Sequence, residues 1–195
     1  MRTYRLAEIV RVLRQKEITV FAARDFARLF NIGRPDTVYK KLARLEKQKI
    51  IQRLIKGRYC FALNPPDDFT TANFLYQPSY ISLESALSFY GVITGFPHRI
   101  MSVTVKKTKT FVAAEKEYQY VQIGSRWFWG YEKKERFLIA EPEKAMIDYL
   151  YLASKGLRSA DIDEFDLSVI NRKKLDNYLR KEADKSLIKL AEKIL

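Results

Sequence analysis

The apolar residues at the start of the chain recur mostly at helical spacing, with one short β-branched run between them. Four of them predict a first amphipathic helix: Leu6, Ile9, Val10 and Leu13. Ile18-Thr19-Val20 indicates a short edge strand, and Phe26, Leu29 and Phe30 mark a second helix. In the turn after that helix we expect Gly33 to adopt the left-handed conformation that often follows a helix end.

A third helix is expected from Pro35 to about Lys49, because proline suits the first helical position. Its apolar stripe consists of Val38, Leu42 and Leu45. Two strand-like runs, 50–55 and 58–63, then flank Lys56-Gly57 and predict a β-hairpin. The order helix, strand, helix, turn, helix, hairpin is that of a winged helix-turn-helix, in which the hairpin is the wing.

The rest of the chain contains both helical and alternating patterns. A short helix is expected within Tyr80–Val92, where Ser82 is positioned to cap the first turn. Strands are expected at Ile100–Val105, Thr110–Val112, Tyr118–Ile123 and Phe137–Ala140. Further helices are expected to begin at Glu141-Pro142 and to cover Asn171–Arg180 and Ser186–Leu195. The predicted fold class is α+β, with an N-terminal winged helix-turn-helix followed by a mixed α/β C-terminal domain.

The clearest break in the pattern is Asn64-Pro65-Pro66-Asp67-Asp68, since proline excludes helix and Asn and Asp favour turns. The charge balance changes there. Residues 1–63 contain 16 Lys and Arg against 5 Asp and Glu, whereas residues 64–195 contain 20 against 18. We therefore predict a winged helix-turn-helix domain at 1–63, a linker at 64–68 and a second domain at 69–195. The alternative is a surface loop within one domain.

The positive charge of residues 1–63 predicts a polyanionic partner, and the winged-helix pattern makes double-stranded DNA the expected one. A recognition helix enters the major groove with its N-terminal residues facing the bases, and other basic side chains contact phosphates. The candidate contacts are Arg24, Arg28, Arg34, Asp36, Thr37, Lys40, Lys41, Arg44, Lys47, Lys56 and Arg58. The alternatives are a solvated basic face and a winged helix that binds protein.

Three C-terminal segments, taken with the winged-helix pattern, resemble the AbiEi-type antitoxins of type IV (AbiE) toxin–antitoxin systems. They are Tyr80–Val92, the strand and turn Ser102–Lys109, and the helix start Ala140–Ala145 with Asp148-Tyr149-Leu150. The resemblance covers nearly the whole chain and rests on the order and spacing of the segments. No single motif in it is as specific as a metal-ligand spacing.

The resemblance implies a two-domain antitoxin, linked to phage abortive infection, that binds operator repeats upstream of its own gene and represses the operon. It also implies that the C-terminal antitoxin domain neutralises a nucleotidyltransferase-like toxin encoded beside it, with no requirement for a stable complex. Lys106, Lys107 and Lys109 form a basic turn between two expected strands. They are a candidate antitoxin surface or second phosphate contact, with plain solvation as the alternative.

Few residues offer catalytic or metal chemistry. One cysteine, Cys60, and one histidine, His98, are too few for a structural zinc site, which needs about four such ligands. Glu143 and Lys144 would suit a restriction-type nuclease, but Pro142 stands where that chemistry needs a carboxylate. We therefore expect no metal, no other cofactor and no enzymatic activity.

The chain contains no apolar run near the ~20 residues that a membrane span needs, and its start does not resemble a signal peptide. A cytoplasmic location is expected. The aromatic segment Trp127–Tyr131 could stack on bases, although a buried core is the favoured interpretation. Two other functions stay open: a solitary transcriptional regulator whose C-terminal domain senses a ligand or partner, and a nuclease guided by the winged helix.

Overall fold

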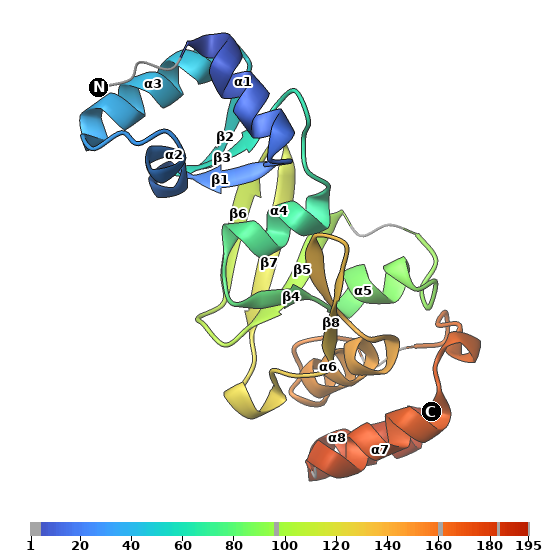
Figure 1. Cartoon of the computed structure of the whole chain (residues 1–195). Coiled ribbons are helices and arrows are strands. Elements are labelled where there is room, and N and C mark those ends of the chain that lie inside the picture. Colours follow the sequence, from blue (N-terminus) through green and yellow to red (C-terminus); the bar gives the residue numbers. More distant parts are fainter. Residues whose placement is uncertain (1–4, 96–97, 160–161, 183, 195) are drawn as a thin grey trace. The chain divides into compact units, whose positions relative to one another are not determined.

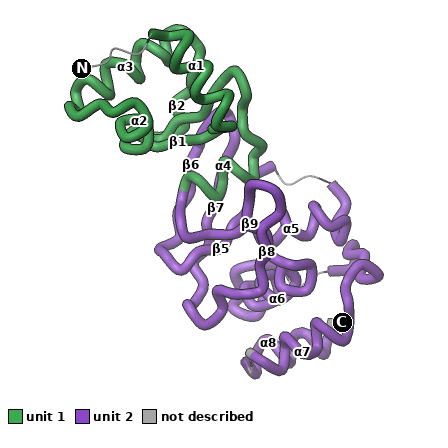
Figure 2. The backbone as a smooth tube through the Cα atoms, in the orientation of Figure 1, with its two compact units in different colours: residues 1–75 green, residues 76–195 purple. Residues whose placement is uncertain are grey.

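The computed structural model describes residues 5–95, 98–159, 162–182 and 184–194, and in these ranges the chain has a mixed α+β fold (Figure 1). The chain divides into two compact units, Met1–Leu75 and Tyr76–Leu195 (Figure 2). Leu195, the last residue of the final expected helix, lies outside the described residues.

The first unit combines helices with a small antiparallel sheet in the strand order β1-β3-β2. Its elements are α1 (Leu6–Gln15), β1 (Val20–Ala22), α2 (Ala23–Leu29), α3 (Pro35–Lys47), β2 (Ile51–Ile55), β3 (Arg58–Phe61) and α4 (Asp68–Leu75). Up to β3 this is the order that the sequence predicts, with the first strand placed two residues later. The apolar sides of α1, α2, α3 and the sheet meet in one core.

The turn between α2 and α3 differs from its prediction. The left-handed residue is Asn31, with a φ of 49°, whereas Gly33 is not among the residues with positive φ. Asparagine tolerates this conformation because its short polar side chain can hydrogen-bond locally. The amide of Ile32 donates to the Ala27 carbonyl over 2.9 Å, and the Ile32 side chain enters the core.

α4 was not expected, and it extends the first unit past the predicted linker to Leu75. The helix has no clear apolar stripe, because buried residues, including Thr70, Thr71 and Asn73, lie around most of its circumference. It is fastened to β3 through Arg58, whose guanidinium donates to the Phe74 carbonyl.

Replacement of Asp67 by alanine is expected to destabilise the first unit by about 1 kcal/mol, since Asp67 caps α4. Its carboxylate accepts hydrogen bonds from the amide of Thr70 over 2.7 Å and from the Thr70 hydroxyl over 2.5 Å. Chemical denaturation of the full chain measures the loss. Exposed Asp36, in the first turn of α3, is the control, because its replacement by alanine removes an equal charge without breaking a side-chain cap.

The second unit is built on a six-stranded mixed sheet in the order β6-β7-β5-β4-β9-β8. Its strands are β4 (Ser79–Ile81), β5 (Arg99–Thr104), β6 (Lys109–Ala113), β7 (Lys116–Gln122), β8 (Tyr131–Lys134) and β9 (Phe137–Ala140). Its α-helices are α5 (Leu83–Phe89), α6 (Pro142–Ser154), α7 (Arg172–Glu182) and α8 (Lys185–Ile194). The pairs β5–β7 and β4–β9 are parallel, and the other neighbours are antiparallel.

α6 is the central helix of the second unit, and it packs against α5, α7 and α8 (Figure 1). Every one of its residues from Glu143 to Leu150 is buried. Pro142 occupies the first turn, as the sequence predicts. The single helix expected within Tyr80–Val92 is instead a strand, β4, followed by the shorter helix α5.

Candidate nucleic-acid interface

α3 presents its polar face away from the core of the first unit. Because its three buried residues fall on one side, Lys40 and Lys47 lie on the opposite side, two turns apart, and both are exposed. Arg44 is exposed beside them, and Thr37 and Lys41 are half-buried at the edge of the face. The helix thus carries a row of cations along its solvent side.

The N-terminal end of α3 is also exposed, with Arg34 as the N-cap residue and Asp36 in the first turn. The amides of a helix's first turn lack intrahelical partners, so this end attracts negatively charged groups. The Asp36 carboxylate already places one negative charge at this end of the helix, and Arg34 adds a positive charge next to it.

α2 contributes Arg24 and Arg28, and both side chains are exposed. Asp25 holds the start of this helix, since its carboxylate accepts the Ala22 amide over 3.1 Å. The same carboxylate lies 3.7 Å from the guanidinium Nε of Arg24. Arg24 is therefore partly neutralised, whereas Arg28 has no ion-pair partner among the described residues.

The β2–β3 hairpin is short, and its turn is anchored. Gly57 adopts a φ of 74°, and its carbonyl accepts the amide of Ala23, the first residue of α2, over 2.9 Å. Lys56 is exposed at this turn. The hairpin turn and the start of α2 are thus held together by a backbone hydrogen bond.

Arg58 has a different environment from the other candidates. Its half-buried guanidinium donates to the Phe74 carbonyl and lies 4.9 Å from the centre of the Phe74 ring. The structure therefore gives Arg58 a contact between β3 and α4 that the sequence does not predict.

Six of the candidate cations are exposed and have no ion-pair partner within the part of the chain that the structure describes. They are Arg28, Arg34, Lys40, Arg44, Lys47 and Lys56. Sequence reasoning missed a further exposed cation, Arg53 on β2, although its place beside Gln52 in an otherwise apolar strand was a signal. Burial raises the pKa of nearby Tyr59, and the positive charge of Arg53 opposes that rise.

The second unit contains a buried polar cluster at the start of α5, where the sequence predicts a helix cap. Asp148 accepts hydrogen bonds from the Tyr80 hydroxyl over 3.0 Å and the Ser82 hydroxyl over 2.7 Å, and it pairs with Lys144. All four residues are fully buried. The expectation that Ser82 caps its helix is wrong, because Leu83 adopts a left-handed φ of 55° and the Ser82 hydroxyl bonds to Asp148 instead of the helix amides.

Aromatic rings lie beside the Lys144 ammonium group, and Gly130 lies against the aliphatic part of the same side chain. The ammonium group lies 5.0 Å from the Trp129 ring centre and 5.8 Å from that of Tyr80. A Cβ atom on Gly130 would come within 2.8 Å of the Lys144 side chain, and Gly130 has a φ of 70°. The cluster therefore has no exposed surface for a substrate. In the segment 127–131, Trp127 is buried and the other four residues are half-buried.

α7 is attached to the start of α6 by charged and aromatic contacts. Lys174 pairs with Glu141 over 3.2 Å and with Glu143 over 3.1 Å. The Tyr178 hydroxyl donates to Glu141 over 2.5 Å, and the Tyr178 ring meets Trp129 edge to face. Burial and the hydrogen bond to Glu141 together raise the pKa of Tyr178 to about 12.

Tyr178 is expected to make the second unit sensitive to alkaline pH. Because its folded pKa of about 12 exceeds the ordinary value of 10.0, its stabilising contribution is complete below pH 10 and is lost as the pH rises towards 12. Between these values the free energy of unfolding should fall more steeply for the natural protein than for the Tyr178→Phe variant. Denaturation series at both ends of the window provide the measurement, and parallel curves would contradict the assignment.

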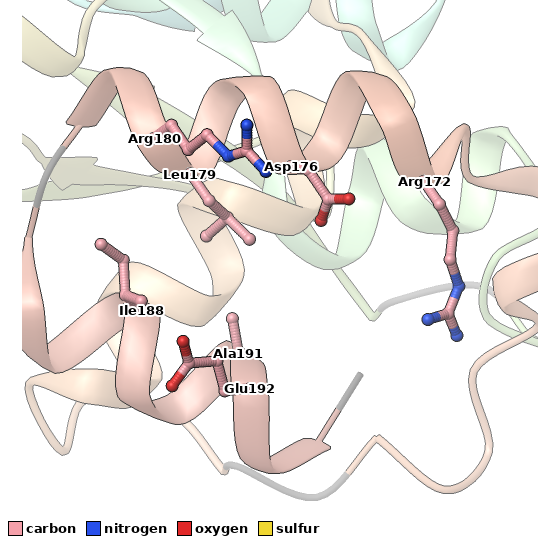
Figure 3. Close-up of a pocket in the computed structure, with 7 residues that line it drawn as sticks. All are labelled: Arg172, Asp176, Leu179, Arg180, Ile188, Ala191 and Glu192. Atoms are coloured by element: carbon pink, nitrogen blue, oxygen red, sulfur yellow. The ribbon is translucent and has the colours of Figure 1, made fainter.

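A groove of about 350 Å³ lies between α7 and α8 (Figure 3). Leu179, Ile188 and Ala191 provide apolar lining, and charged residues of both signs complete it. The charged residues are Arg172, Asp176, Arg180 and Glu192.

The basic turn predicted between two strands is also present. Lys106 and Lys107 are exposed between β5 and β6, and Lys109 is exposed as the first residue of β6.

Comparison of the chain with models of protein families and with curated proteins found no match. Within the described ranges, no group of three or more His, Cys, Asp or Glu side chains is arranged to hold a metal ion. None of the helices in those ranges combines the length and apolar character that crossing a bilayer requires.

Proposed function

We propose that the first unit is a winged helix-turn-helix that binds double-stranded DNA, with α3 as the recognition helix and the β2–β3 hairpin as the wing. The observation that carries this proposal is the row of exposed, unpaired cations on the face of α3 opposite its buried stripe. Lys40, Arg44 and Lys47 lie along α3, and Lys56 adds a cation at the hairpin turn. A helix of this kind fits the major groove, and phosphates attract the flanking cations.

The whole chain would then act as an AbiEi-type antitoxin that represses its own operon and neutralises a neighbouring nucleotidyltransferase-like toxin. Support for this comes from the resemblance of the sequence and from a separate α+β second unit joined to the basic first unit. The second unit is proposed to act without catalysis, because its most concentrated polar cluster, around Lys144 and Asp148, is sealed from solvent.

The alternative function is a solitary transcriptional regulator whose second unit senses a small ligand. The groove between α7 and α8 favours it, because an apolar lining edged by Arg172, Arg180, Asp176 and Glu192 suits a small molecule with charged groups (Figure 3).

A cell-based experiment separates the two functions. The full chain is expressed with a reporter driven by its own upstream DNA and, separately, with the adjacent gene under an inducible promoter. The proposal predicts repression of the reporter and rescue of growth when the adjacent gene is toxic. Repression without any toxicity of the adjacent gene would instead support the solitary regulator.

A further inference from the structure

β6 forms one edge of the six-stranded sheet, and its pairing partner is β7. An edge strand leaves alternate backbone N–H and C=O groups without partners in the sheet, which is a template for a further strand. β6 is also well exposed: Lys109, Thr110 and Val112 face solvent, and Val112 is 71% exposed. Covering an apolar side chain that is this exposed, on an open strand edge, would be energetically favourable.

The turn before β6 presents its lysines in a fixed arrangement. The Lys106 amide donates to the Thr104 hydroxyl over 3.2 Å, and the Tyr76 hydroxyl donates to the Lys107 carbonyl over 3.2 Å. The Lys106 and Lys109 ammonium groups lie 5.5 and 5.9 Å from the Tyr76 ring centre. Lys109 also lies 4.8 Å from the centre of the Phe111 ring.

Three positive charges therefore border the β6 edge. Lys106, Lys107 and Lys109 have no acidic partner among the described residues. Parallel pairing of this edge with β6 of a second copy would bring lysines against lysines, and like charges on neighbouring strands are destabilising. Antiparallel pairing centred on Phe111 would place Lys109 opposite Ala113, so no acidic side chain would stand directly across from it. A strand with acidic side chains would pair with the backbone groups of the edge and also balance the positive charge of the lysines.

A nucleic acid fits this surface less well than a polypeptide does. The aromatic rings beside the turn, Tyr76 and Phe111, are already covered by lysine ammonium groups and are half-buried, so they offer no open face for a base. Phosphates can accept hydrogen bonds from the edge amides but cannot donate to its carbonyls, and they would not bury Val112. Residues 76–195 also contain 20 Lys and Arg against 16 Asp and Glu, so the second unit has no broad basic field.

We propose that the β6 edge and the lysines of the turn before it form a docking site for an acidic polypeptide segment, which adds to the sheet as a seventh strand. Backbone hydrogen bonds to β6 would provide the affinity, and the lysines would select acidic side chains. An apolar residue of the partner would cover Val112. The inference does not depend on DNA binding by the first unit.

The test uses the full chain and a fluorescein-labelled peptide of sequence Glu-Val-Glu-Thr-Glu-Val-Glu. A second peptide, Glu-Pro-Glu-Pro-Glu-Pro-Glu, has the same charge but lacks three of the amide donors and resists strand pairing. Fluorescence anisotropy should detect binding of the first peptide and not of the second. Amide exchange followed by NMR should show new protection on alternate residues of β6 when the first peptide is bound.

The variants test the role of the lysines. The Lys106→Glu/Lys107→Glu/Lys109→Glu protein is expected to bind the first peptide about tenfold more weakly or worse, since favourable charge pairs are replaced by like-charge contacts. Lys107→Glu alone should weaken binding in the same direction. Unlike Lys106 and Lys109, Lys107 does not place its ammonium group over an aromatic ring of the described residues, so its replacement disturbs no such contact. The matched control, Lys133→Glu/Lys173→Glu/Lys189→Glu, changes three exposed lysines elsewhere on the second unit and should bind normally.

Equal binding of the two peptides, or equal loss in the turn and control variants, would show attraction by charge alone and overturn the proposal. Each variant is also titrated with duplex DNA. If the turn variant loses DNA affinity relative to the control while peptide binding is absent in every protein, the turn is a nucleic-acid site and the proposal is wrong. Loss of DNA binding by first-unit variants has no bearing on this result.

Discussion

Replacement of Lys144 by alanine is expected to destabilise the second unit by about 3–5 kcal/mol, because it leaves Asp148 charged and unpaired in the core. Both side chains of this ion pair are fully buried, and the carboxylate also accepts from Tyr80 and Ser82. Both tryptophans of the chain, Trp127 and Trp129, lie in the second unit. Denaturation followed by tryptophan fluorescence therefore measures the loss in that unit.

Two further variants separate the cost of an unpaired charge from the loss of packing. Lys144→Met/Asp148→Asn removes both charges but keeps an amide oxygen that can accept from Tyr80 and Ser82. It should be more stable than Lys144→Met alone, which is the non-additivity expected of contacting residues. The control is Lys155→Ala, which breaks an ion pair with Asp184 at the surface and should cost less than about 1 kcal/mol. A Lys144→Ala loss no larger than that of Lys155→Ala would contradict the buried pair.

The second large expected effect is a loss of affinity for DNA. The Lys40→Ala/Lys47→Ala protein is expected to bind its upstream DNA more weakly, and the slope of log affinity against log salt should fall by about two if both lysines contact phosphate. If one of them reads a base, its loss costs about 1–3 kcal/mol and reduces the preference for the natural sequence. Titrations at several salt concentrations distinguish these cases.

The control for the DNA variant removes two exposed lysines from the second unit, as Lys173→Ala/Lys189→Ala. It keeps the same net charge as the Lys40→Ala/Lys47→Ala protein, so a shared loss would indicate a general effect of charge. A folded Lys40→Ala/Lys47→Ala protein with unchanged affinity and slope would remove the polar face of α3 from the interface.

The elements that the sequence predicts best are those in which local pattern and tertiary packing agree. α3 begins at Pro35 and buries the predicted stripe, and β5, β6, β7 and β9 follow the predicted strand-like runs closely. The helix α6 begins at Pro142, where the missing amide has no cost. The exposed cations of α3 could also be read from the sequence, because they fall off its apolar stripe.

The features that could not be predicted depend on partners that lie far apart in the chain. Ser82 has the local pattern of a helix cap, and only the fold brings Asp148, 66 residues away, to its hydroxyl. In the sequence Lys144 resembles a surface lysine, because no local pattern indicates that it is buried. Besides β4, which was expected to be helical, the elements α4 and β8 were missed. α4 is buried around most of its circumference, and β8 is a largely polar edge strand.

The environment of Arg58 shows why the residues of the interface could not all be predicted from the sequence. Its place on the expected wing made it a candidate DNA contact, but its guanidinium packs on Phe74 in the unpredicted helix α4. The exposed cations of the β2–β3 hairpin are instead Arg53 on β2 and Lys56 at the turn. Charge along a strand therefore indicates a basic face, whereas the neighbouring element decides which side chains remain available to a partner.

The central claim, DNA binding by the first unit, is tested most directly by titrating the full chain with the duplex upstream of its own gene and with a scrambled duplex. Measurements at two salt concentrations separate base recognition from general attraction to phosphate. We predict tight binding to the upstream duplex and much weaker, more salt-sensitive binding to the scrambled one. Equal, steeply salt-dependent binding to both would contradict the claim of an operator-binding repressor and leave a basic surface without sequence preference.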